Sequence, residues 1–370
     1  MDTAIVPGFL GLGQATARGI VMGAAQRDRL GRTLLVHGPA GAGLDGFVDD
    51  LLALLLCADA DPAQRPCNAC RGCREARARA HPDLVVGSAA AWRDARSGGE
   101  SIVAAARRWL LETSGAPIVA RHRVVLIEAA DLAGEATQNA LLKALEEPNR
   151  RQLFVLTATD PARLLPTIRS RAQVLRLGPV PRNELVVWLV EREHLTDDQA
   201  RAVARIANGM AGTAIGYARQ PGLLEWRRRV QGELLGLLER GRADRFAAAR
   251  ELVAEASRMA LPSEEEPATT DGQPAAPATA QQRAGALLVL EAWIGLARDL
   301  AVVAAGRPGL APGIELVEGI EAAGGRISPV HAANAVRVLE RVRESVATNA
   351  APRLAMSVAM LAWPVLEPSR

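Results

Sequence analysis

Short apolar runs separated by amphipathic segments mark the first half of the chain. Leu34–Val36, Val124–Ile127 and Leu153–Leu156 are continuous apolar runs, which are typical of strands buried on both faces of a parallel sheet. Between the last two runs, Thr137–Glu147 places apolar side chains at helical intervals, and Pro148 ends that helix. The pattern therefore predicts a βαβ unit.

Two further strands are expected at Leu84–Val86 and Val174–Leu177. After residues 178–181, which contain two prolines, the spacing of apolar residues becomes helical to the end of the chain. Residues 262–282 are rich in Pro, Ala, Thr and Glu and carry almost no large apolar side chains. We predict that this segment is a disordered insertion, because it buries too little surface to offset its ordering entropy.

Composition narrows the class of protein. The chain has 370 residues, 49% of them hydrophobic and only 3% aromatic, which favours a helix-rich protein of two or three domains. A formal net charge of +3 indicates no general nucleic-acid surface, although a local basic patch remains open. Met1–Pro7 lacks the pattern of a secretory signal, and no apolar run reaches the length of a membrane span. We expect a cytoplasmic protein.

Four cysteines lie close together in the sequence. Cys57, Cys67, Cys70 and Cys73 follow a C-x9-C-x2-C-x2-C pattern, and the short spacings allow the thiolates to converge on one tetrahedral ion. Four sulfur ligands favour a structural Zn²⁺ site over a catalytic one. The alternative is four reduced cysteines. His81 is a less favoured fifth ligand and is expected to form a turn.

A glycine-rich loop follows the first strand. Gly38 and Gly43 have the spacing of a phosphate-binding loop, but Leu44 stands at the lysine position and Asp45 at the Ser/Thr position. Lysine contacts the β- and γ-phosphates and Ser/Thr holds magnesium, whereas an aspartate repels a triphosphate. We therefore interpret the loop as a tight strand-to-helix turn with no functional nucleotide site.

Two motifs carry a family resemblance. Asn139–Pro148 reads NALLKALEEP and Leu165–Arg171 reads LPTIRSR. Together with the cysteine cluster, they resemble the clamp-loader branch of the AAA+ ATPases, well over residues 1 to 215 and loosely beyond.

The resemblance implies the architecture. Residues 1–180 are expected to form an α/β AAA+ domain, a parallel sheet flanked by helices, with the zinc module inserted at 57–73. Residues 181–217 are expected to form a small helical lid. Residues 218–370 are expected to form an all-helical C-terminal collar domain for oligomerisation, interrupted by the insertion at 262–282.

The same resemblance suggests that hydrolysis has been lost. Active relatives carry Asp-Glu where this chain has Glu128-Ala129, so the carboxylate that orients the attacking water is missing. Thr159 stands at the polar sensor position, and Gly212 stands where active members have an arginine. We expect no ATP hydrolysis in this subunit.

Ser170-Arg171, in contrast, matches the corresponding motif of active family members. In the family this arginine acts as a finger on ATP bound by a neighbouring subunit, and Ala172 replaces the usual cysteine after it. Arg169 is the less favoured candidate, and the alternative is that both arginines are ordinary surface residues.

The resemblance therefore implies a non-hydrolysing subunit of the bacterial DNA polymerase III clamp loader. It would pair with tau/gamma and delta subunits, and the assembled ring would load the sliding clamp onto primed DNA. Two rival hypotheses are an ATP-hydrolysing tau/gamma-type subunit and a stand-alone zinc-containing AAA+ adaptor. Leu44, Asp45 and Ala129 argue against the first rival, and complex formation through residues 218–370 would argue against the second.

Overall fold

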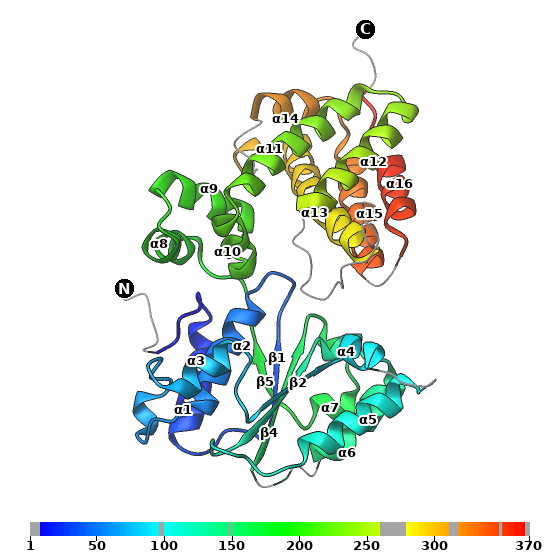
Figure 1. Ribbon diagram of the computed structural model, residues 1–370. Coiled ribbons are helices and arrows are strands. Elements are labelled where there is room, and N and C mark those ends of the chain that lie inside the picture. The colour runs from blue at the N-terminus through cyan, green and yellow to red at the C-terminus, as the bar shows by residue number, and fades with distance from the viewer. Residues whose placement is uncertain are drawn as a thin grey trace, which may run out of the picture. The chain divides into compact units, whose positions relative to one another are not determined.

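A computed structural model describes most of the chain. The described residues are 8–95, 100–146, 149, 151–259, 279–310, 317–347 and 350–366. They divide into two compact units, Met1–Arg219 and Gln220–Arg370 (Figure 1). Each unit is described here by itself.

Five parallel strands form the sheet of the first unit, in the spatial order β2-β3-β4-β1-β5. The strands are β1 (Thr33–His37), β2 (Leu84–Ser88), β3 (Arg123–Glu128), β4 (Gln152–Ala158) and β5 (Gln173–Arg176). Each of the five predicted strands is present. β1 and β4 are neighbours, yet the chain leaves them for opposite edges of the sheet. In parallel α/β sheets, the carboxyl ends of strands at such a reversal of strand order usually hold the functional loops.

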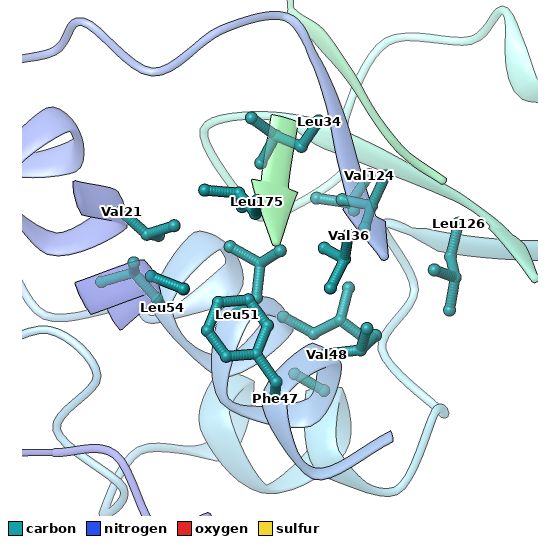
Figure 2. Packing of buried hydrophobic residues seen from close by; sticks show 14 of the residues in the cluster. Val21, Leu34, Val36, Phe47, Val48, Leu51, Leu54, Val124, Leu126 and Leu175 are labelled. Atoms are coloured by element: carbon teal, nitrogen blue, oxygen red, sulfur yellow. The ribbon is translucent and has the colours of Figure 1, made fainter. Parts of the chain in front are cut away.

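Both faces of the sheet are covered, which explains the continuous apolar runs. Leu34 and Val36 pack with Leu51 in one buried cluster (Figure 2). The intervening Leu35 packs with Leu141 in a second cluster on the other face. Since successive strand residues point to opposite faces, a strand buried on both faces needs an apolar residue at every position.

The helices of the first unit lie on both sides of the sheet, with α1–α3 on one side and α4–α6 on the other (Figure 1). The helices are α1 (Ala15–Gln26), α2 (Leu44–Leu56), α3 (Arg71–Arg77), α4 (Ala89–Asp94), α5 (Ile102–Thr113), α6 (Glu135–Glu146) and α7 (Pro166–Arg169). Residues 88–100 are polar and contain glycine, a pattern that predicts a loop, but the structure forms α4 there. The Ser88 hydroxyl caps it by accepting a hydrogen bond from the Ala91 amide at 3.1 Å, and the buried Trp92 anchors it.

Three helices complete this unit: α8 (Arg182–Glu193), α9 (Asp197–Ala207) and α10 (Ala211–Arg219). The start of α9 carries a capping box, in which the side chains of Thr196 and Gln199 each accept a hydrogen bond from the other residue's backbone amide. Arg219 on α10 forms an ion pair with Glu193 at the end of α8.

The second unit is all-helical. Its helices are α11 (Pro221–Gly236), α12 (Arg242–Met259), α13 (Thr279–Ala304), α14 (Val317–Gly324), α15 (Pro329–Ala347) and α16 (Pro352–Ala362). The buried Trp293 on α13 meets Trp363 edge-on, with ring centroids 5.5 Å apart. No helix among those described is long and apolar enough to span a bilayer.

The predicted insertion at 262–282 is corrected at its carboxyl end. Residues 260–278 lie outside the described residues, but Thr279–Gln282 form the first turn of α13. Alanine and glutamine favour helix, and this turn continues into the apolar core face of α13.

Candidate functional site

The loop between β1 and α2 makes a tight turn at the carboxyl edge of the sheet. Gly41 and Gly43 have φ values of +80° and +89°, a region in which side-chain-bearing residues are strained. Leu44 is half-buried and packs against the core, while Asp45 is exposed in the first turn of α2. From Gly38 to Asp45 the loop carries no cationic side chain.

The amino end of α10 packs directly on this loop. The Gly41 carbonyl accepts hydrogen bonds from the amides of Gly212 at 2.8 Å and Thr213 at 3.4 Å. A Cβ at Gly41 would lie 2.3 Å from the Thr213 hydroxyl, and one at Gly212 would lie 3.1 Å from the Gly41 carbonyl. The absence of a side chain at Gly212 therefore lets α10 close onto the loop.

Glu128, at the carboxyl end of β3, is engaged by an arginine that the sequence did not single out. Arg79 contacts Glu128 and Asp49 of α2, each at 2.9 Å. Burial raises the pKa of Asp49, and Arg79 opposes that shift. Arg79 thus places a positive charge between the carboxylates of Asp49 and Glu128.

Thr159 follows β4, and its hydroxyl is also engaged. It donates a hydrogen bond to the buried Asp131 carboxylate at 2.9 Å, and the same oxygen accepts from the amides of Thr159 and Asp160. The sequence analysis did not identify Asp131. Its position three residues after the end of β3, near the carboxyl edge of the sheet, could have indicated it. The Thr159 hydroxyl at the sensor position therefore donates its hydrogen bond to another residue of this chain, Asp131.

Arg171 lies just beyond α7, on the surface. Its guanidinium forms an ion pair with Glu146 of α6 at 3.0 Å and donates to the Thr167 carbonyl at 3.1 Å. The side chain is 42% exposed. Ser170 and Arg169 are exposed as well, and the Ser170 hydroxyl donates to the Thr167 carbonyl at 3.1 Å.

α6 positions this arginine segment through Gln138. The buried Gln138 amide donates to the carbonyls of Ala133 at 2.8 Å and Arg163 at 3.1 Å, and its oxygen accepts from the Leu165 amide at 2.8 Å. Gln138 therefore joins α6, the helix that carries the NALLKALEEP motif, to the LPTIRSR segment by hydrogen bonds from its side chain to the backbone. Glu147 and Pro148 of the first motif lie outside the described residues.

The four cysteines come together as the spacing predicted. The sulfurs of Cys57, Cys67, Cys70 and Cys73 all lie within 4.8 Å of one another and form no disulfide. Cys57 ends α2 and Cys70 caps α3. His81 is not part of the cluster, since its Nδ1 accepts the Asp83 amide at 3.0 Å in a turn.

The environment of these sulfurs fits a metal ion. The Cys73 amide points at the Cys70 sulfur at 3.3 Å, and the Cys70 amide points at the Cys67 sulfur at 3.4 Å. Burial raises the pKa of Cys70, but hydrogen bonds from backbone amides and from the neighbouring cysteine thiols outweigh it and lower the pKa to about 6. Burial raises the pKa of Cys57 and Cys73. Four convergent sulfurs with amide donors suit a tetrahedral Zn²⁺ site.

Comparison with known proteins supports the resemblance. Residues 13–181 match the family model described as DNA polymerase III, delta subunit. The chain is 32% identical over 190 residues to the DNA polymerase III subunit delta′ of Escherichia coli, which covers 51% of this chain and 55% of that protein. It is 30% identical over 206 residues to the delta′ subunit of Bacillus subtilis, covering 55% and 59%.

A second subunit type is also similar. The DNA polymerase III subunit gamma/tau of Mycobacterium tuberculosis is 29% identical over 221 residues, covering 54% of this chain and 37% of that protein. The chain spans a little over half the length of the delta′ relatives it matches. The expected likeness to clamp-loader subunits of the delta-prime kind is thus confirmed for this part of the chain.

Proposed function

We propose that this chain is a non-hydrolysing, delta-prime-like subunit of a DNA polymerase III clamp loader. One observation carries the proposal: the chain's own loop lacks the phosphate-binding charges and is packed against α10, while Arg171 is exposed for use elsewhere. In this role the subunit contributes to hydrolysis without performing it.

Arg171 would act on ATP bound by an adjacent tau/gamma subunit. Its guanidinium would stabilise the charge that develops on the γ-phosphate, and the loss of such a finger typically costs about 10³ to 10⁵ in rate. Within this chain, Glu146 and the Thr167 carbonyl hold the guanidinium, and Gln138 holds the segment that leads into α7. These contacts restrict where the arginine can reach.

The cysteine cluster and the second unit would stabilise the subunit and join it to its partners. The cysteine cluster would hold a structural Zn²⁺ that ties α2 to α3. The second unit would serve as the collar that joins this chain to tau/gamma and delta subunits. The assembled ring would then open the sliding clamp and load it at primed DNA.

The test is the DNA-stimulated ATPase activity of the reconstituted loader. Arg171→Ala should lower turnover by at least about 10³-fold while the complex still elutes as one species. Arg169→Ala is the matched control, because it removes an exposed arginine two positions away and should leave turnover within about twofold of wild type. Unchanged turnover with Arg171→Ala, or a loss confined to Arg169→Ala, would refute the assigned role.

The tau/gamma-type alternative has its own discriminator. The isolated chain should show no ATPase activity, because Leu44 and Asp45 replace the lysine and the magnesium ligand. Measurable turnover by the purified chain that is lost on Glu128→Gln would favour that alternative.

A further inference from the structure

A cavity of about 230 Å³ lies at the amino ends of the strands. Arg32 directly precedes β1, His122 directly precedes β3, and Gln152 begins β4. Because the strands are parallel, this edge of the sheet is opposite to the edge that carries the glycine loop and Glu128. The cavity is therefore separate from the site described above.

The polar lining of this cavity is predominantly basic. It consists of Asp28, Arg32, Arg65, Arg121, His122 and Gln152. Three arginines against one aspartate leave two net positive charges when the histidine is neutral. The rest of the wall is apolar and comes from the ends of α1 and α2 and their neighbours.

Two of the arginines are fixed by backbone contacts. Arg65 donates to the carbonyls of Asp59 at 2.7 Å and Ala60 at 3.1 Å, and Arg32 donates to the Asn149 carbonyl at 3.3 Å. Carbonyl oxygens carry no full charge, so the contacts orient the Arg65 guanidinium without cancelling its charge. Arg121 is exposed at the rim.

The positive charges around the cavity affect the pKa of the half-buried His122. Burial lowers the pKa of His122, and Arg32, Arg121 and Arg151 lower it further, while Asp28 opposes them. The imidazole therefore sits in a locally positive environment that an anion would relieve.

We propose that this cavity binds the phosphate group of a ligand, either free phosphate or a phosphate of a nucleic-acid backbone. Guanidinium groups offer paired N–H donors that match phosphate oxygens. Donors here come from three separate segments, before β1, before β3 and within the cysteine module, which suits a tetrahedral dianion better than a planar carboxylate. The net charge of the lining also matches a phosphate dianion.

The experiment measures binding of inorganic phosphate to the full-length chain by isothermal titration calorimetry at matched ionic strength. Arg121→Gln should weaken the affinity about tenfold or more, as expected for a lost charge-assisted hydrogen bond. Arg107→Gln, which removes an exposed arginine of α5 that does not line the cavity, should leave it unchanged. Should Arg121→Gln alter the circular dichroism spectrum, Arg32→Gln serves as the second variant.

A short oligonucleotide identifies the source of the phosphate. If its affinity also falls with Arg121→Gln and the salt slope of its binding drops by about one, the ligand is a nucleic-acid backbone. If phosphate binding alone depends on Arg121, the ligand is free phosphate. Absence of saturable phosphate binding, or equal loss in the Arg107→Gln control, would overturn the proposal.

Discussion

Arg171 and Glu146 pair on the surface of the first unit, and both side chains are about two-fifths exposed. An exposed ion pair contributes only about 0.2 to 1 kcal/mol to stability. Its larger effect is geometric, since the pair holds the guanidinium beside the end of α6. The pair joins the two motifs that carried the family resemblance.

Glu146→Gln is expected to slow the reconstituted loader by about two- to fivefold, which is the kinetic equivalent of losing an exposed pair. The readout is DNA-stimulated ATPase activity, which a change in stability alone would not move. Glu135→Gln, at the other end of the same helix, is the control and should have no effect. A wild-type rate for Glu146→Gln would mean that the pair does not orient Arg171.

Asp83 stabilises the loop before β3. Its fully buried carboxylate accepts hydrogen bonds from the amides of Ile118, Val119 and Ala120 at 2.5, 2.8 and 2.7 Å. Burial raises the pKa of Asp83, but these amides outweigh it, so the pKa lies below its ordinary value. The carboxylate therefore stabilises the fold above the unfolded-state pKa of about 3.9, and this contribution is lost as the pH falls through the folded-state pKa.

Asp83→Asn should cost about 2 kcal/mol of local stability at pH 7, because an amide group cannot replace a carboxylate that accepts three N–H groups. Hydrogen exchange of residues 118–120 should speed up accordingly. The two proteins should converge only when the pH falls below the folded-state pKa of Asp83, which lies below its ordinary value. Asp94→Asn removes an exposed carboxylate and should leave this exchange unchanged; equal protection in Asp83→Asn and wild type at pH 7 would contradict the assignment.

The loop between β1 and α2 packs against the amino end of α10. The loop must adopt positive φ at Gly41 to offer its carbonyl to the first turn of α10. Phe47 and Leu51 of α2 then reach the core. Contacts with α10 on one side and with the core on the other thus fix the conformation of the loop.

Gly41→Ala should lower stability by at least about 1 kcal/mol, because alanine is strained at this φ and its Cβ would collide with the Thr213 hydroxyl. Gly46→Ala lies in the first turn of α2, and the added Cβ has open space around it. It should raise stability by about 0.5 to 1 kcal/mol through helix propensity. Thermal unfolding of the two variants tests this opposite sign, and a stable Gly41→Ala would show that the loop is not constrained by α10.

The cysteine module is tied to the rest of the unit by charged contacts. Buried Asp50 of α2 forms ion pairs with Arg18 at 3.3 Å and Arg77 at 2.8 Å, and it accepts the amides of Leu10 and Gly11. α3 has only seven residues, too few for a stable isolated helix. Its position therefore depends on these contacts and on the cysteines.

Purified protein should contain about one zinc ion per chain, as expected for a Cys₄ site. Cys70→Ser should lose most of this zinc by elemental analysis and lower the melting temperature, because α2 and α3 are no longer joined. His81→Asn is the control and should retain the zinc. Zinc-free wild-type protein that melts like Cys70→Ser would mean that the four cysteines are simply reduced.

At the scale of the whole molecule, the second unit carries an exposed apolar stripe on its last helix. Leu354, Val358 and Leu361 of α16 are exposed at helical spacing, while Met356 and Met360 on the opposite side are buried. A stripe of this kind fits a contact between subunits. The stripe is therefore the surface on which the proposed collar role of this unit can be tested.

The double change Val358→Asp with Leu361→Asp should weaken association with tau/gamma and delta subunits at least about tenfold, because it places charge in a desolvated contact. Size-exclusion chromatography of the mixed subunits reports assembly, and circular dichroism reports folding. Arg353→Asp, at an exposed polar position of the same helix, should still assemble. Normal assembly of the double variant would exclude this stripe as the contact.

Local sequence pattern was sufficient to predict the strands, the cysteine cluster and the lack of a lysine and a Ser/Thr in the glycine-rich loop. Strands buried on both faces produce continuous apolar runs, and the cysteine spacing limits how far the sulfurs can separate. The short α4 was missed because its only local signal is the Ser88 cap within a polar stretch. The sequence alone therefore predicted the first unit's sheet and the location of most candidate groups.

Tertiary structure alone decided which charged groups meet. Arg79 reaches Asp49 and Glu128, and Arg171 reaches Glu146, across segments that only the strand order brings together. The basic cavity at the opposite edge exists because parallel strands place residues at the starts of β1, β3 and β4 side by side. Hydrophobic periodicity encodes which face of an element is buried, but it does not encode which elements become neighbours.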